Sequence, residues 1–330
     1  MLPARKIIHI VADFVTAGGG REHARALRTL LSTHANVQCW SEEYLPPTLA
    51  KEARVIRPFS AEYPSGGTLI VLGPQRRLTP WISRCRAKRI VLVCNVSEPT
   101  HLFRQLACIR GNGLPEPEIS YVSHRLRETI GLAGRVNISP LMVENFKTAC
   151  RPQRRPIVGR HSRDTPEKHH PMDASLYKQL VLNGFDVRIM GGTCLSSVIP
   201  SGTAGIELLD FGYEHPVQFL MGLDIYFYRT HPALHETAGR SLLEAMASGL
   251  AIVASTAGGY CDWLRHGESG YLINDQDEAF NRIMELGTDA ELRKKLGAAA
   301  QAAAFQLSGP EARQRLIDWY LADTNPPINA

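Results

Sequence analysis

Short apolar runs that alternate with helical stretches are the feature that most constrains how this chain can fold. In the first half, KIIHIVA at 6–12 and RIVLVC at 89–94 contain almost no polar residue. Strands of this kind are buried on both faces, as in parallel sheets covered by helices. Strands alternating with helices therefore predict an α/β fold with a parallel sheet. The further strands predicted in this half are 37–40, 54–57, 68–72, 118–122 and 137–140, with helices at 21–31 and 124–131.

The alternation stops once, at 146–156, and then begins again. That segment, FKTACRPQRRP, is basic, contains two prolines and has no apolar periodicity, so it is interpreted as a linker. The sequence thus predicts a first domain at 1–150 and a second at 151–330, with a last helix at 310–321 that packs back on the first domain. The other elements predicted after the linker are strands at 157–159, 187–190, 206–209, 224–228, 251–254 and 270–273, and helices at 173–183, 215–221, 240–248, 261–266, 276–286 and 289–305.

Composition excludes several classes of protein. Apolar residues make up 44% and charged residues 21%, which is typical of a globular chain, and the net charge of +5 is too small to predict a nucleic-acid partner. The seven cysteines show no CxxC spacing, and no apolar run approaches the length that spans a bilayer. We therefore expect a cytoplasmic protein. Arg84, Arg86, Lys88 and Arg89 are a candidate contact with the inner face of a membrane, or alternatively a solvated basic face.

The stretch His235–Gly249, HETAGRSLLEAMASG, carries the clearest chemical signal. Glu236 precedes Gly239 in a small-residue loop, and Glu244 follows Glu236 after seven intervening residues, inside a predicted helix. The amino end of a helix after such a loop offers N–H groups and a positive dipole end to an anion such as phosphate. A carboxylate two turns further on suits sugar hydroxyls, so a nucleotide is indicated. The alternative is that both glutamates are solvated residues that complement the helix dipole.

Residues 224–273 resemble the retaining nucleotide-sugar glycosyltransferases of family 4. The resemblance includes the spaced glutamate pair, EAMASG, AIVAS, the Gly258-Gly259 pair and the HGESGYL turn, together with IVGRHSR at 157–163 and a later lysine. It implies the GT-B architecture, in which two Rossmann-like parallel-sheet domains face a central cleft. The second domain would then hold the nucleotide-sugar donor and the first domain the acceptor.

The resemblance also implies roles for individual residues. Arg160 and Lys168 would stabilise the leaving phosphate, Glu236 would contact the donor sugar and Glu244 would hold the ribose. The spacing from Arg160 to Lys168 is longer than is usual in the family, so Arg163 is an alternative cation, and Ala238 stands where relatives commonly have an aromatic residue. The other residues expected to bind the nucleotide-sugar are Gly159, Thr237, Gly239 and Arg240.

Two features of the first domain are further candidates. Gly18, Gly19 and Gly20 follow the first strand but do not match GxGxxG, so they either approach the donor diphosphate or form a tight turn. His101 follows RIVLVC, where many relatives have a histidine that contacts the donor sugar or acceptor. It is either that contact or a residue at the start of a helix.

The sequence therefore predicts a retaining glycosyltransferase of polysaccharide or glycoconjugate synthesis. It would move a sugar from a nucleoside-diphosphate-sugar to a hydroxyl of a glycan or lipid-linked acceptor. The resemblance implies that no cofactor and no metal are needed, since such enzymes generally use protein cations in place of a metal. Consistent with this, DQD at 275–277 lies at a predicted helix start and is interpreted as a cap. The alternatives are a nucleotide-sugar epimerase, a phosphorolytic enzyme on the same fold, or a non-catalytic glycan-binding protein.

Overall fold

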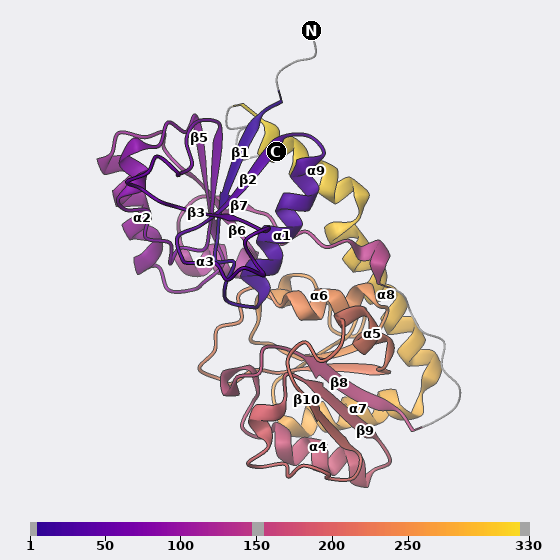
Figure 1. Ribbon diagram of the computed structural model, residues 1–330. Helices are drawn as coiled ribbons and strands as arrows, with labels where there is room; N and C mark the ends of the chain where they lie inside the picture. Colours follow the sequence, from indigo (N-terminus) through magenta and orange to yellow (C-terminus); the bar gives the residue numbers. More distant parts are fainter. Residues whose placement is uncertain (1–4, 147–154, 324–330) are drawn as a thin grey trace. The chain divides into compact units, whose positions relative to one another are not determined.

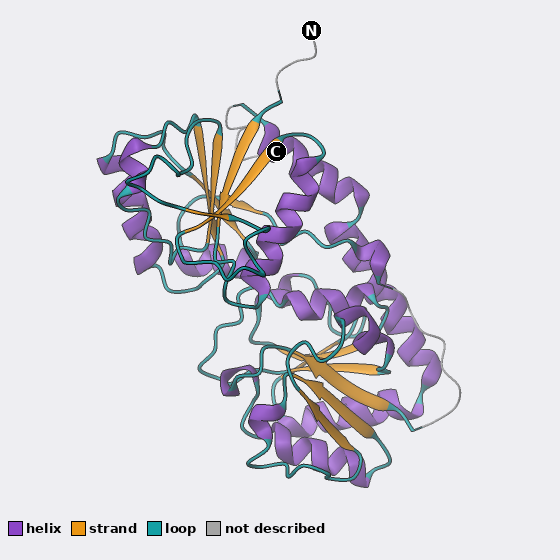
Figure 2. Ribbon diagram, viewed as in Figure 1, coloured by secondary structure: helices purple, strands orange, loops and turns teal. Residues whose placement is uncertain are grey.

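The computed structural model describes residues 5–146 and 155–323, and the chain divides into two compact units (Figure 1). The first unit contains Met1–Pro140 and Glu311–Ala330, and the second contains Leu141–Pro310. The predicted domain boundary at 150 lies outside the described residues. Each unit is a parallel sheet with helices packed around it (Figure 2).

The first unit contains a seven-stranded sheet in the order β3-β2-β1-β4-β5-β6-β7, with every pair parallel. The strand order reverses beside β1, so the carboxyl ends of β1 and β4 flank a switch point, where ligands of such sheets commonly bind. The strands are β1 Ile7–Val11, β2 Asn36–Ser41, β3 Arg54–Val55, β4 Thr68–Leu72, β5 Arg89–Cys94, β6 Glu118–Tyr121 and β7 Arg135–Val136. The helices are α1 Gly19–Ser32, α2 Thr100–Gly111, α3 His124–Ile130 and α9 Pro310–Leu321.

The second unit contains a six-stranded parallel sheet in the order β10-β9-β8-β11-β12-β13, and its switch point lies between β8 and β11. The strands are β8 Ile157–His161, β9 Asp186–Met190, β10 Ile206–Leu209, β11 Ile225–Tyr228, β12 Ala251–Ser255 and β13 Tyr271–Ile273. The helices are α4 Asp173–Leu182, α5 Pro216–Met221, α6 Arg240–Ala247, α7 Gln276–Thr288 and α8 Ala290–Ser308.

Three local predictions differ from the structure. The strand predicted at 137–140 lies earlier, because β7 pairs with β6 through Arg135 and Val136. The helix predicted at 261–266 is one 3₁₀ turn, Gly259–Asp262, since the chain then turns back and the Ser269 hydroxyl accepts the Arg265 N–H. The structure also contains α2, which was not predicted. Two cap predictions are confirmed: Ser123 accepts the N–H of Leu126, and Asp275 accepts that of Glu278.

Arg89 connects β5 to the last helix of the chain. Its Nε and Nη2 donate to the Glu118 carboxylate at 2.6 and 2.7 Å, and its Nη1 donates to the carbonyls of Trp319 and Tyr320 at the end of α9. The guanidinium also lies over the Trp319 ring, 5.0 Å from its centroid. A cation at a helix carboxyl end complements the dipole there. Arg89 is therefore buried, and the prediction that it contributes to a basic surface is wrong, whereas Arg84, Arg86 and Lys88 are exposed.

Close packing of α8 against the turn after α6 requires a glycine. A Cβ atom at Gly297 would lie 2.1 Å from the carbonyl oxygen of Gly249, which no side chain can tolerate without a backbone shift. Gly297 lies in the middle of α8, where glycine itself costs roughly 1 kcal/mol relative to alanine. The close approach of the two backbones explains why this cost is accepted.

We predict that Gly297→Ala destabilises the protein by about 1–3 kcal/mol, because overpacking outweighs the gain in helix propensity. Urea unfolding followed by circular dichroism measures the change. Gly111→Ala in α2 is the matched control, since a Cβ there meets no atom within 4 Å. That control should be neutral or slightly stabilising, and equal stability of the two variants would contradict the packing argument.

Candidate functional site

The switch point of the second sheet brings together polar residues from β8 and β11. The two strands pair through Val158 and Gly159, and the pairing does not continue to the ends of the strands. Arg160 and His161 end β8, and Tyr228 ends β11. These positions are buried at the carboxyl edge of the sheet, where ligands bind in open parallel sheets.

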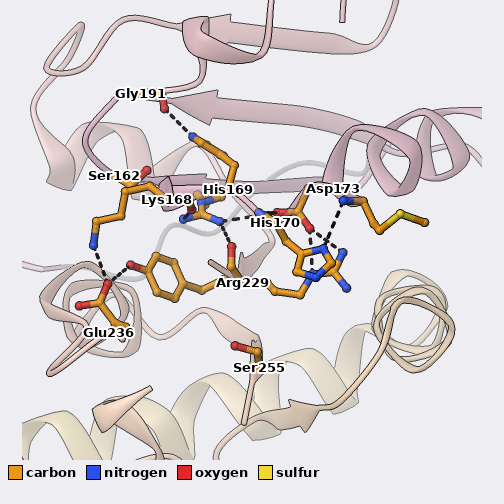
Figure 3. A network of polar contacts seen from close by, with 12 residues as sticks. Ser162, Lys168, His169, His170, Asp173, Gly191, Arg229, Glu236 and Ser255 are labelled. Carbon is orange, nitrogen blue, oxygen red and sulfur yellow. Dashed lines mark hydrogen bonds and ion pairs between the residues drawn. The ribbon is translucent and has the colours of Figure 1, made fainter. Parts of the chain in front are cut away.

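Glu236 is held beside β11 by two donors. Its Oε2 accepts hydrogen bonds from Lys168 Nζ at 2.6 Å and from the Tyr228 hydroxyl at 2.7 Å (Figure 3). Burial disfavours the charged carboxylate, but the Lys168 charge and the two hydrogen bonds outweigh burial and lower the pKa of Glu236. The structure therefore brings together Lys168 and Glu236, two residues that the sequence selected 68 positions apart.

The loop that carries Glu236 is shaped by two glycines against one aromatic ring. Gly239 has φ of 82°, in the left-handed region, and a Cβ there would lie 2.6 Å from Tyr260 Cδ1. A Cβ at Gly258 would lie 2.0 Å from the same ring, and the Gly259 N–H donates to the Glu236 carbonyl at 2.8 Å. The predicted Gly258-Gly259 loop thus fixes the backbone of Glu236 through this hydrogen bond.

Glu244 lies in the second turn of α6 and also has two donors. His161 Nε2 lies 2.8 Å from its Oε2, and Arg240 Nε donates to its Oε1 at 3.0 Å. Burial raises the pKa of this carboxyl, but the His161 hydrogen bond and the Arg240 charge outweigh burial, so the pKa of Glu244 is lowered. Both glutamates of the predicted pair are therefore fixed, ionised carboxylates on either side of the start of α6.

The environment of Arg160 differs from the predicted one. Its side chain is 0% exposed, and its Nη1 and Nη2 donate to the backbone carbonyls of Arg229 and Lys168 at 2.5 and 2.6 Å. Its guanidinium also lies 4.5 Å from the centroid of the Tyr228 ring. Both terminal nitrogens of the guanidinium, which was predicted to bind phosphate, thus donate to backbone carbonyls. In this structure Arg160 holds the backbone beneath the site.

Asp173 completes this buried cluster. It is 0% exposed, and its Oδ1 accepts hydrogen bonds from Arg229 Nε and Nη2 at 2.9 and 2.7 Å (Figure 3). The other oxygen lies 3.9 Å from Arg160 Nη1. Asp173 therefore compensates two desolvated guanidinium groups, which a buried charge requires.

The remaining predicted residues of the second unit lie in different surroundings. Arg163 is half-buried and forms no ion pair within the described part of the chain. Gly159 has a packing reason, because a Cβ there would lie 2.4 Å from the Arg188 carbonyl. Thr237 and Ala238 are partly exposed in the loop between the two glutamates. Their contacts with a donor stay predictions.

Gly18, Gly19, Gly20 and His101 belong to the first unit. Gly18 precedes α1 with φ of 144°, and a Cβ at Gly20 would lie 3.6 Å from Asn95 Nδ2. His101 lies in the first turn of α2, 43% exposed, and its Nε2 is 3.9 Å from Glu98. The prediction that these residues contact the donor or acceptor stays a prediction.

Four buried residues of this site were not predicted: His161, Asp173, Tyr228 and Arg229. Tyr228 and Arg229 end the apolar run DIYFYR, and His161 follows Arg160 at the end of β8. A polar residue at the carboxyl end of a buried parallel strand was the available signal. Asp173 had no such signal, since it reads as an ordinary first-turn acid of α4. Within 5–146 and 155–323, no group of three or more His, Cys, Asp or Glu could hold a metal, and no helix could cross a membrane.

We predict that Arg160→Met destabilises the protein by about 3–5 kcal/mol, because it leaves two buried carbonyls without their donor and removes one of the two cations beside Asp173. Chemical denaturation measures the loss. Arg163→Met removes a guanidinium from the same loop without breaking a described ion pair, and it should cost less than about 0.5 kcal/mol. Comparable losses in the two variants would show that Arg160 does not hold the backbone.

A second prediction concerns His169, whose Nε2 lies 2.9 Å from the Gly191 carbonyl. Burial and the Arg160 charge lower the pKa of His169 to about 4. The unfolded chain, with a pKa near 6.5, binds the proton more readily, so stability is full above pH 6.5 and falls toward pH 4, by up to about 3 kcal/mol.

Unfolding experiments between pH 4 and 8 test this dependence. His169→Gln keeps a donor for the Gly191 carbonyl and should flatten the curve between pH 4 and 6.5. The exposed His34→Gln variant should retain the wild-type pH dependence. An unchanged slope in His169→Gln would assign the acid sensitivity to other groups.

Comparison with known proteins agrees with this geometry. Residues 206–303 match the family model described as glycosyl transferases group 1. The chain is 31% identical over 185 residues, 54% of its length, to a GDP-mannose-dependent alpha-mannosyltransferase of Mycolicibacterium smegmatis, of which the match covers 46%. It is 39% identical over 75 residues, 21% of the chain, to sulfoquinovosyl transferase SQD2 of Arabidopsis thaliana, of which the match covers 15%. The chain thus spans less than half of the length of these curated relatives.

Solved structures extend the likeness to nearly the whole chain. Anabaena HepE in complex with UDP-glucose has a TM-score of 0.71 at 17% identity and covers 95% of this chain and 98% of its own. TarM has a TM-score of 0.75 at 11% identity and covers 97% and 99%. The resemblance found in residues 224–273 is therefore confirmed. The chain has the GT-B fold, and its residues 206–303 match the model of the group 1 glycosyl transferases.

Proposed function

We propose that the protein is a retaining glycosyltransferase that moves a sugar from a nucleoside-diphosphate-sugar to a hydroxyl of a glycan or lipid-linked acceptor. The observation that carries this proposal is the pair of fixed carboxylates, Glu236 and Glu244, on either side of the start of α6. The pair lies within the segment that matches the group 1 glycosyltransferases. The similarity to a mannosyltransferase and to a sulfoquinovosyl transferase supports the same reaction class.

A diphosphate is accommodated by the charges around this pair. The start of α6, after the left-handed Gly239, offers the positive end of a helix dipole to the leaving phosphate. The buried cluster beside this pair contains three cations and two carboxylates, and therefore carries one net positive charge. The cations are Lys168, Arg160 and Arg229, and the carboxylates are Glu236 and Asp173. Fixed positive charge stabilises the negative charge that grows on the leaving phosphate in the transition state. In this proposal Lys168 and Arg163 contact the phosphates, and Arg160 acts from behind them.

Glu236 faces the reacting sugar in this proposal. Its Oε2 is occupied by Lys168 and Tyr228, which fix its rotamer, and its lowered pKa keeps it ionised at neutral pH. A fixed carboxylate accepts the donor sugar's hydroxyls and stabilises the positive charge that develops at the anomeric carbon. We propose a front-face displacement in which the leaving phosphate receives the acceptor proton.

Glu236→Gln tests the proposal. The amide oxygen still accepts the hydrogen bonds of Lys168 and Tyr228 but carries no charge, so turnover of a nucleoside-diphosphate-sugar by the folded variant should fall by about 10²–10³-fold. Glu268→Gln, an exposed neighbour of Arg265 in the same unit, is the control and should keep wild-type turnover. Undiminished turnover in Glu236→Gln would overturn the proposed role.

Product analysis in the same assay separates the rival activities. A glycosyltransferase requires an acceptor and releases a nucleoside diphosphate, and a retaining one gives a product with the anomeric configuration of the donor. Conversion of the nucleotide-sugar to its epimer without an acceptor would favour an epimerase, and turnover that requires added phosphate would favour a phosphorolytic enzyme. A cytoplasmic location, and a peripheral membrane contact through Arg84, Arg86 and Lys88, belong to this proposal as well. Arg89 is excluded from that contact because it is buried.

A further inference from the structure

Glu244 is held by a histidine from another element of the sheet. His161 ends β8, 83 positions before Glu244, and its Nε2 lies 2.8 Å from Glu244 Oε2. The Arg240 contact, by comparison, is an i,i+4 pair along α6 itself. The His161 contact ties the carboxylate to the sheet. His161 therefore fixes where Glu244 points relative to β8, whereas Arg240 moves with the helix that it shares with Glu244.

The imidazole of His161 is itself fixed on two sides. The rings of Phe219 and Tyr226 lie edge-on to it, with centroids 6.0 and 5.8 Å away. The Tyr226 hydroxyl donates to the His161 carbonyl at 3.3 Å and lies 3.5 Å from Nδ1. An ionised carboxylate only accepts hydrogen bonds, so Nε2 carries the proton toward Glu244 and Nδ1 faces Tyr226. The His161 side chain is 8% exposed, so these neighbours enclose the ring.

A glutamate side chain has three rotatable bonds, and ordering it costs free energy when a ligand binds. A carboxylate that is already oriented binds a diol more tightly, because that ordering precedes the ligand. Each oxygen of Glu244 is engaged by one donor and has a further lone pair for a hydroxyl. The pair His161–Glu244 is thus arranged as a preformed acceptor of two hydroxyl groups.

We propose that His161 is the positioning residue for recognition of the donor's ribose: it orients Glu244 so that both carboxylate oxygens accept the 2′ and 3′ hydroxyls. The proposal rests on the proposed function, since it assigns Glu244 to the ribose. His161 touches no reacting atom. Its loss should therefore weaken nucleotide binding and raise the donor KM, while kcat changes little.

The test measures binding of nucleoside diphosphates to the full chain by calorimetry. Uridine, guanosine and adenosine diphosphates are compared first, and the tightest is used together with its 2′,3′-dideoxy analogue. His161→Phe keeps a ring between Phe219 and Tyr226 but removes the donor. We expect it to bind the ribonucleotide about tenfold more weakly, the effect of one charge-assisted hydrogen bond, and the dideoxy analogue as the wild type does.

Two further variants complete the design. His161→Gln places an amide N–H near the position of Nε2 and should restore affinity to within about threefold of the wild type. His266→Gln is the matched control and should bind normally, because this exposed histidine contacts the Leu272 backbone and the Tyr271 ring and lies far in the sequence from Glu244.

Either of two results would overturn the role of His161: ribonucleotide binding by His161→Phe at wild-type affinity, or equal losses for the ribonucleotide and its dideoxy analogue. If no nucleoside diphosphate binds the wild type, the proposed function itself fails. Wild-type binding that is insensitive to the ribose hydroxyls overturns the inference alone.

Discussion

The buried guanidinium of Arg160 is the interaction on which the rest of the site depends. Its two Nη atoms hold the carbonyls of Lys168 and Arg229, which lie in loops that come from different strands of the second sheet. One loop supplies the Nζ that binds Glu236, and the other follows the tyrosine whose hydroxyl binds the same oxygen. A planar fork with several donors can make these contacts at once, whereas a lysine could not. Asp173 makes its burial tolerable by compensating the charge.

Charge compensation at this site is local and incomplete. Asp173 lies beside two arginines, Lys168 forms an ion pair with Glu236, and Glu244 is contacted by His161 and Arg240. Because burial strengthens each electrostatic interaction, the pKa values of both glutamates stay low although desolvation alone would raise them. The consequence is a pair of ionised carboxylates in a setting of positive charge. This arrangement can hold the hydroxyls of a sugar and the oxygens of a diphosphate side by side.

Much of the fold could be predicted because buried parallel strands leave a strong pattern. KIIHIVA and RIVLVC contain β1 and β5, and DIYFY at 224–228 contains β11. The helix at 261–266 was wrong because a short apolar run between a glycine pair and a turn fits either a helix or a single turn. For the site, the sequence pattern indicated Glu236 and Glu244, and the family resemblance added Lys168 and assigned Arg160 to the phosphate. Whether the guanidinium of Arg160 contacts a ligand or backbone carbonyls depends on how deeply this side chain is buried, and the sequence pattern does not reveal that burial.

The sequence by itself determined the alternation of strands and helices, the repetition of that pattern after a basic linker, and the two glutamates with seven residues between them. These features depend on local composition and on the spacing of residues that are close in the sequence, so they can be recognised without the fold. Only the tertiary structure decided which donor fixes each glutamate. His161 meets Glu244 across 83 residues and Lys168 meets Glu236 across 68, because parallel strands bring their carboxyl ends to one edge. Contacts of that range depend on strand order, and strand order is a property of the folded sheet.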